Sequence, residues 1–231
     1  MTNIKIISKK EYLKKNRKPN QEKIWDNISK PWKRYRQNNI SLVEKFLKNK
    51  KGKVIDIGCG TGRNMIPDNY LQYIGIDFSK EQLAQAKKII KEKKINAKLI
   101  KSKASNLSKI KDNYFDYGLF IASLHCIETK EEREKSLKEF YRVLKPKAKA
   151  LITTWNSEDK RFSHLKNKGD IYMSWKEDNI DYMRYYYLFK KNKLKKLIKN
   201  NEFKILKIYK NNEKEKDRFV RKNWIIEIQK I

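Results

Sequence analysis

Short apolar runs alternate with amphipathic segments through most of the chain. The runs are rich in Ile, Val, Leu and Phe, and each has the length of a buried strand. They lie at residues 54–57, 73–77, 97–101, 115–122 and 148–155. Between them, apolar residues fall at helical spacing, as at Leu137, Phe140 and Leu144. Strands that alternate with helices are typical of a doubly wound α/β fold with a mainly parallel sheet.

The two ends of the chain depart from this alternation. Residues 1–20 form a basic segment, and two further strands near 203–209 and 223–228 close the chain. A charged loop joins these last strands, which predicts an antiparallel C-terminal strand pair. The sequence thus predicts a seven-stranded, mostly parallel sheet in a domain over 21–231, with an insertion at about 156–182.

The composition favours one globular domain. The 231 residues are 39% hydrophobic and 12% aromatic, enough for a proper core. No apolar run reaches the roughly 18 residues of a membrane span, and the N-terminus lacks the apolar region of a secretory signal. The two cysteines lack Cys-x-x-Cys spacing. We therefore expect a cytoplasmic protein without a membrane partner, a disulfide framework or a metal site.

The chain also carries a large positive charge, with 58 basic and 27 acidic residues giving +31. A nucleic-acid partner would explain it, because Lys and Arg neutralise phosphates. Compositional bias explains it too, since Lys, Asn and Ile are abundant together and lysines occur along nearly every segment. Residues 29–36 interleave aromatic and cationic side chains around Pro31, where we expect a helix to break. This pattern suits stacking of single-stranded bases, and it equally suits a kinked surface segment.

The stretch KVIDIGCGTG, residues 53–62, contains the clearest sign of a ligand site. An apolar run is followed by Gly58, Gly60 and Gly62, which allow a tight turn and close approach of the backbone to a ligand. A helix opening after the turn would direct free amides and its positive dipole end at that ligand. The loop is therefore a candidate cofactor cradle at the end of the first strand of the sheet.

An acidic residue on the next strand supports the interpretation of this loop as a cofactor cradle. Asp77 ends the next strand, 19 positions after Gly58, which is the spacing at which an acid meets ribose hydroxyls. The dinucleotide pattern would need a third glycine where Arg63 stands, and the Lys-Ser/Thr of a nucleoside triphosphate loop is absent. Both departures weaken the assignment of a dinucleotide or a nucleoside triphosphate.

Taken together, IDIGCGTG, IGID, FDYGLFIASLHCIE and a helix ending RVLKP resemble the class I S-adenosylmethionine methyltransferases over residues 24–155. The resemblance implies a Rossmann-like fold and S-adenosylmethionine as cofactor. It implies that the cofactor-binding residues are Asp56, Gly58, Cys59, Gly60, Gly62, Asp77, Phe78, Ala104 and Ile121. The family often has an acid for the adenine amino group where this chain has Lys103, so adenine must be read by backbone near Ala104 or by a neighbouring residue.

A narrower resemblance comes from motifs outside that region. Lys30-Pro31-Trp32, GDIYMSWK (169–176), RYYYLF (184–189) and RKNW (221–224) occur in the order seen in tRNA methyltransferases that esterify 5-carboxymethyluridine at the wobble position. This resemblance implies a tRNA partner and a small zinc-binding activator protein, for which the sheet edge near 97–100 is the expected place.

A carboxylate acceptor is already ionised at neutral pH, so the reaction needs no general base. It does need a clamp for an anion, and the fork of donors on arginine suits that task. The candidate catalytic residues are Arg184 and Arg221 as clamps and His125 as a polar positioning group. The candidate substrate-binding residues are Lys30, Trp32, Arg34, Trp175, Lys176 and Tyr185. Two alternatives stay open: a class I methyltransferase acting on a small molecule or protein, and a non-catalytic RNA-binding fold.

Overall fold

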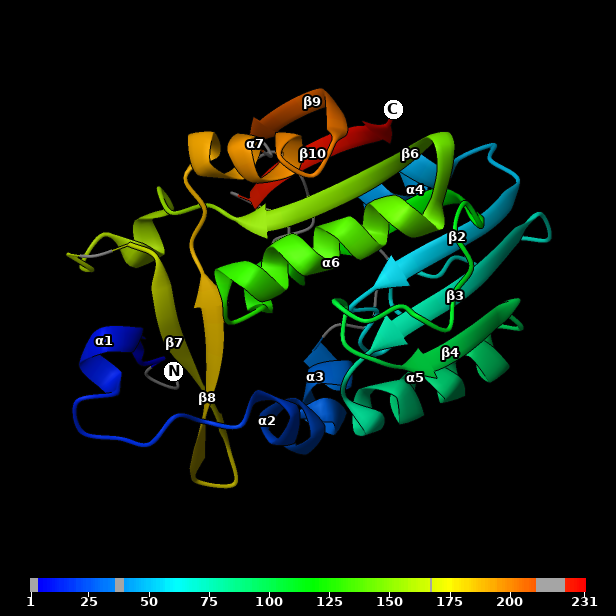
Figure 1. Ribbon diagram of the computed structural model, residues 1–231. Coiled ribbons are helices and arrows are strands. Elements are labelled where there is room, and N and C mark those ends of the chain that lie inside the picture. Colours follow the sequence, from blue (N-terminus) through cyan, green and yellow to red (C-terminus); the bar gives the residue numbers. More distant parts are fainter. Residues whose placement is uncertain (1–3, 36–39, 167, 211–222) are drawn as a thin grey trace.

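The computed structural model describes residues 4–35, 40–166, 168–210 and 223–231. Its main sheet has seven strands in the order β4-β3-β2-β5-β6-β10-β9 (Figure 1). Their bounds are Gly52–Ile57 (β2), Leu71–Asp77 (β3), Ala97–Lys101 (β4), Phe115–Ile121 (β5), Leu144–Trp155 (β6), Phe203–Lys210 (β9) and Asn223–Lys230 (β10). The first five of these in the sheet order are parallel, and β10 is antiparallel to both β6 and β9. The predicted fold class and the antiparallel C-terminal pair are confirmed.

Helices cover both faces of the sheet, because neighbouring strand residues point to opposite sides. On β5, Phe120 packs into the core beneath α6 (Lys130–Val143) and α7 (Lys191–Lys199). Its neighbour Leu119 packs into the core beneath α4 (Ser41–Leu47) and α5 (Lys80–Glu92). The result is a three-layer sandwich.

A small second sheet joins the N-terminal segment to the predicted insertion (Figure 1). It has the order β1-β7-β8, with β1 at Ile6–Ser8, β7 at Asp170–Glu177 and β8 at Ile180–Tyr187. Strand β7 pairs antiparallel with both neighbours, and the short helix α1 (Lys9–Tyr12) follows β1. Two 3-10 turns, Leu124–Cys126 and Lys160–Phe162, follow β5 and β6.

Two local predictions are wrong. No helix follows the glycine loop, because Gly60 and Gly62 adopt φ of +53° and +79°, which an α-helix cannot include. Pro31 does not break a helix either. The break falls at Ile28, between α2 (Gln21–Asn27) and α3 (Ser29–Tyr35), and Pro31 lies in the first turn of α3, where it displaces no helical hydrogen bond.

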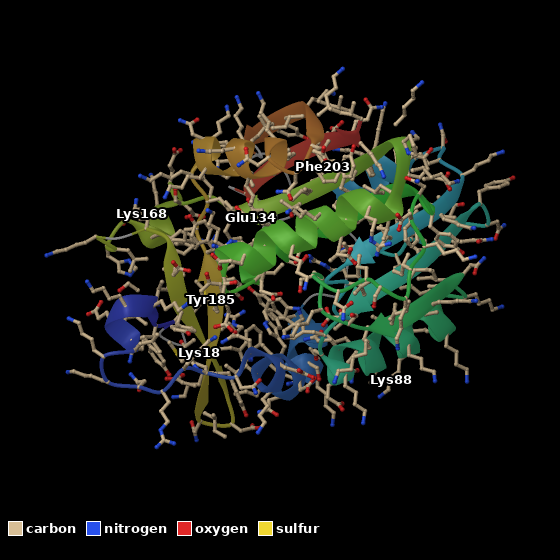
Figure 2. All side chains as sticks on the ribbon, viewed as in Figure 1. Lys18, Lys88, Glu134, Lys168, Tyr185 and Phe203 are labelled. Atoms are coloured by element: carbon tan, nitrogen blue, oxygen red, sulfur yellow. The ribbon has the colours of Figure 1, made fainter. Side chains whose placement is uncertain are left out.

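Figure 2 shows nitrogen-tipped side chains around the whole outline of the molecule, with Lys88 and Lys168 far apart on it. The positive charge is thus widely distributed over the surface. No helix in the described part of the chain has the length and apolar character needed to cross a membrane.

Candidate active site

A cavity of about 370 Å³ lies at the carboxyl ends of β2, β3, β4 and β5. Its size is that of a small-ligand site, and its position is where parallel α/β sheets bind ligands. Residues of α2 and α3 form the opposite wall, including Trp25 and Trp32. Eight predicted site residues line the cavity: Gly58, Cys59, Gly60, Asp77, Phe78, Ala104, Ile121 and Trp32.

Gly58 shapes the floor of the cavity. Its φ is +66°, and an added Cβ would come 2.4 Å from Cβ of Ser123. The Ser123 hydroxyl donates to the carbonyl of Ile57 at 2.8 Å, so the ends of β2 and β5 are joined at this point. Only glycine satisfies both the backbone angle and the contact.

Gly62 and Asp56 act behind the cradle. Gly62 is buried, and a Cβ there would lie 3.3 Å from Cβ of Ala86 on α5, so this glycine serves helix packing and does not line the cavity. Asp56 accepts a hydrogen bond from Nδ2 of Asn64 at 3.3 Å, which ties the loop to β2. Complete burial raises the pKa of Asp56 to about 7, and the nearby charge of Asp77 adds to the increase.

Asp77 anchors the glycine loop from β3. Its Oδ2 accepts from the backbone N–H of Gly60 at 2.8 Å, and its Oδ1 accepts from that of Ser79 at 2.9 Å. Burial raises its pKa to about 6, although these backbone donors oppose the increase. The carboxylate thus lies in the cavity wall with its orientation fixed.

The wall formed by α2 is fastened to the rest of the site. Oδ1 of Asp26 accepts from Oγ of Ser79 at 2.6 Å and from the N–H of Glu81 at 3.1 Å, which caps the start of α5. Lys18 and Glu128, which both line the cavity, form an ion pair at 3.2 Å. The sequence reasoning missed this wall, since an unremarkable amphipathic pattern around Trp25 gave no sign of contact with a ligand.

Arg184 occupies a buried aromatic cage. It is 5% exposed, and its guanidinium carbon lies 5.2–6.0 Å from the ring centroids of Trp25, Trp32, Trp175 and Tyr186. Nη2 donates to the carbonyl of Ser174 at 3.2 Å, whereas Nε–H has no hydrogen-bond partner among the described residues. Trp25 and Trp32 also line the cavity, so the cation lies directly behind its wall.

Two predicted residues lie away from the cavity. His125 is 1% exposed and stacks against Trp155 at 5.1 Å, so it does not face the cavity itself. Tyr185, labelled in Figure 2, is fully buried; its hydroxyl donates to Asp170 and accepts from Nη1 of Arg133 at 3.2 Å. These bonds hold the small sheet against α6, and Tyr185 does not line the cavity.

The remaining predicted residues belong to α3 and β7, the elements that contribute Trp32 and Trp175 to the aromatic cage. Trp175 contacts Trp32 edge-on at 5.4 Å between centroids, and Arg34 pairs with Glu177 at 3.0 Å. Lys30 and Lys176 are exposed beside them. Arg221 lies outside the described residues.

Comparisons with known proteins identify the class. A family described as "Methyltransferase domain" matches residues 48–218. A solved S-adenosylmethionine-dependent methyltransferase of Methanosarcina mazei superimposes with a TM-score of 0.67 at 21% identity, covering 84% of this chain and 99% of its own. The chain therefore belongs to this methyltransferase family.

Two relatives extend over most of the chain. A protein of Schizosaccharomyces pombe, named tRNA (carboxymethyluridine(34)-5-O)-methyltransferase, is 28% identical in an alignment of 201 residues that covers 76% of this chain and 84% of that protein. A protein of Encephalitozoon cuniculi, named as a candidate methyltransferase, is 27% identical over 192 residues, covering 80% and 87%.

The residues of the cavity fit the cofactor of this class, S-adenosylmethionine. Asp77 offers a fixed buried acceptor for a ribose diol, and the cradle at Gly58 has no space for a side chain. Oε1 of Gln82 is a buried acceptor without a partner among the described residues, and Gln82 lines the cavity beside Gly60. The predicted cofactor class is therefore confirmed.

Proposed function

We propose that this methyltransferase esterifies the carboxylate of 5-carboxymethyluridine at the wobble position of tRNA. The observation that supports this acceptor most strongly is the environment of Arg184. A buried guanidinium with unused donors is costly unless an anion reaches it. Within the described residues no carboxylate pairs with it, and aromatic rings enclose it on several sides. The site is thus complementary to a planar anion delivered through the cavity.

The reaction that follows is simple in its proton balance. The cofactor supplies a methyl group on a sulfonium. A carboxylate oxygen of the acceptor forms a bond to that methyl carbon while the carbon–sulfur bond breaks, and its electron pair stays on sulfur. No proton is transferred, so the reaction needs no general base, and no histidine is among the described residues that line the cavity.

In this proposal, the residues of the aromatic cage and its rim have distinct roles. Arg184 holds the carboxylate by charge-assisted hydrogen bonds, and Trp32 and Trp175 present ring faces and edges for bases of an opened anticodon loop. Lys30, Arg34 and Lys176 neutralise phosphates at the outer rim. His125 supports the cage from behind through Trp155 and Tyr186, whose rings stack at 4.0 Å.

The proposed activator would pair with β4, the strand at one edge of the main sheet. Ala97, Leu99 and Ile100 are only partly buried on that strand, and the backbone of an edge strand is available for β-augmentation.

The test uses an anticodon stem-loop carrying 5-carboxymethyluridine, labelled cofactor and the candidate activator. We expect base-labile label on the modified stem-loop and none on the same RNA with plain uridine. Label on the free 5-carboxymethyl nucleoside at a comparable rate would instead support a small-molecule acceptor. If S-adenosylhomocysteine binds but neither the stem-loops nor the free nucleoside acquire a methyl ester, 5-carboxymethyluridine is ruled out as the acceptor.

A further inference from the structure

The end of the cavity near β4 lacks an obvious partner for adenine. Ser102, Lys103, Ala104 and Ser105 line this end. Adenine carries an exocyclic amine, and a buried donor left without an acceptor costs binding free energy. The ammonium of Lys103 has three donors and no acceptor, so it cannot receive this hydrogen bond.

A carboxylate reaches the same end of the cavity from another element. Glu132, in the first turn of α6, lines the cavity, and its Oε2 accepts from the hydroxyl of Ser105. A carboxylate offers about four lone-pair directions, so the bond to Ser105 leaves acceptor capacity on a side chain that lines the cavity. Only Ala104 separates Ser105 from Lys103, which places Glu132 beside the position where an acceptor is needed.

The position of Glu132 is well defined. Downstream of Ser105, the N–H of Leu107 donates to Oε2 of Glu139 at 2.7 Å, and Nη2 of Arg142 donates to the carbonyl of Leu107 at 2.9 Å. Glu132, Glu139 and Arg142 all belong to α6, so the loop after β4 is fastened along this helix. Such support keeps a ligand-contacting side chain in place.

Among the described residues, one other carboxylate besides Asp77 and Glu132 lines the cavity, that of Glu128. Its Oε2 is paired with Lys18 on the side of the N-terminal segment, and its buried Oε1 has no partner in the described part of the chain. The sheet order places β2, β3 and β4 side by side. With the amino-acid end at Gly58, directly after β2, and the ribose at Asp77, at the end of β3, the base would lie over the loop after β4, which contacts Glu132.

We propose that Glu132 recognises the exocyclic amino group of the cofactor's adenine, in place of an acid at position 103. The proposal rests on the cofactor class and is independent of the tRNA acceptor. It makes Glu132 a determinant of base specificity, because a carboxylate facing the keto oxygen of hypoxanthine would oppose two acceptors.

The test compares the affinity of the whole protein for S-adenosylhomocysteine and for its deaminated analogue, S-inosylhomocysteine, by calorimetry. We expect the wild-type protein to favour the adenine form, and E132Q to lower that ratio at least about tenfold, since the amide can donate to the keto oxygen. S105A, which removes only the positioning bond, should lower it about threefold. The matched control is E131Q, on an exposed neighbour that does not line the cavity.

Three results would overturn the proposal. One is a ratio of the two affinities that E132Q leaves unchanged. A second is an equal fall in the affinity of E132Q for both ligands, which indicates a structural role only. The third is loss of the ratio in E128Q, which would make Glu128 the reader. Failure of the wild-type protein to bind S-adenosylhomocysteine would overturn the cofactor class itself, which is a distinguishable outcome. Unfolding curves without ligand separate these results from misfolding.

Discussion

The two ends of the cavity are built in different ways. The cofactor end consists of backbone groups and a buried carboxylate from β2, β3 and the loop between them, including Gly58, Gly60 and Asp77. The proposed acceptor end consists of large side chains from segments far apart in the sequence, such as Trp32 in the wall and Arg184 behind it. A backbone cradle is insensitive to most substitutions but not to an added Cβ. A side-chain cage depends on each of its members, and the expected effects of mutation differ accordingly.

The largest effect is expected at the cradle. In Gly58→Ala, alanine would have to adopt φ of +66° with its Cβ 2.4 Å from Ser123, so the loop must move. Strain and overpacking together cost about 2–4 kcal/mol, and we expect affinity for S-adenosylhomocysteine to fall about 100-fold. Calorimetry measures this change. Gly169→Ala is the control, because its nearest neighbour is 4.0 Å away, and it should bind normally. A change within twofold in Gly58→Ala would show that the cradle does not define the site.

The next largest effect is expected at the cage. Arg184→Gln removes the charge that holds the acceptor anion, so kcat/KM for the carboxymethylated stem-loop should fall about 30- to 100-fold, as for loss of a charged hydrogen bond. Affinity for S-adenosylhomocysteine should stay within twofold, which separates the two ends.

The matched control for Arg184 is Arg161→Gln. Arg161 also lies over aromatic rings, at 5.0 Å from Trp155 and 5.1 Å from Phe162, but it is already paired with Asp159. Its substitution should leave kcat/KM nearly unchanged. Equal losses of kcat/KM in both variants would mean that arginines packed on aromatic rings act through folding in general. Arg184 would then not form a specific anion site.

The same contrast explains what the sequence could predict. At the cofactor end the signals are local: Gly58 and Asp77 lie on consecutive strands, and parallel strands place their ends together. The cage depends on β7, which pairs with β1 from the other end of the chain, and periodicity along one strand gives no information about that pairing. Tyr185 is buried in this small sheet, and the ring of His125 packs against Tyr186 of the same sheet at 5.6 Å between centroids, so neither side chain lines the cavity. Motif order alone does not reveal these contacts.

The absent helix after the glycine loop has a similar physical reason. Glycines that permit positive φ also prevent a helix from starting among them, and turns such as Met65 N–H to the carbonyl of Gly62 at 3.1 Å take its place. The tie between Asn64 and Asp56 could not be read from sequence either, because it depends on that turn geometry.

An intermediate effect is expected from pH at the cofactor end. Burial raises the folded-state pKa of Asp77 to about 6, above its value in the unfolded chain. The ionised form accepts from ribose hydroxyls, so affinity for S-adenosylhomocysteine should increase about tenfold from pH 5 to pH 7. Asp77→Asn should flatten this profile and bind weakly throughout. A profile in Asp77→Asn as steep as that of the wild-type protein would assign the titration to another group.

Unfolding without ligand should show the opposite trend. A group whose folded pKa is raised contributes stability below its unfolded pKa, and this contribution is lost as pH rises through the folded pKa. For Asp77 the window is about pH 4 to 6, and for Asp56 about pH 4 to 7. The free energy of unfolding of the ligand-free protein should therefore decrease across this range, by about 3 kcal/mol for Asp77 and about 4 kcal/mol for Asp56. Asn variants should reduce the slope.

The smallest effect is expected for lysines at the rim of the cage. Their substitution tests whether the positive charge there forms an RNA-binding surface or only reflects compositional bias. Lys176→Ala should weaken binding of the stem-loop about twofold and reduce the magnitude of its salt slope by about 0.7, as for one phosphate contact on single-stranded RNA. Lys204 is exposed on β9, at the far edge of the main sheet. Lys204→Ala should change neither the affinity for the stem-loop nor its salt slope. Equal changes in the two variants would mean that the lysines bind RNA without regard to position. The charge of +31 would then say nothing about the acceptor, and the specificity of the acceptor end would rest on Arg184 and its aromatic rings alone.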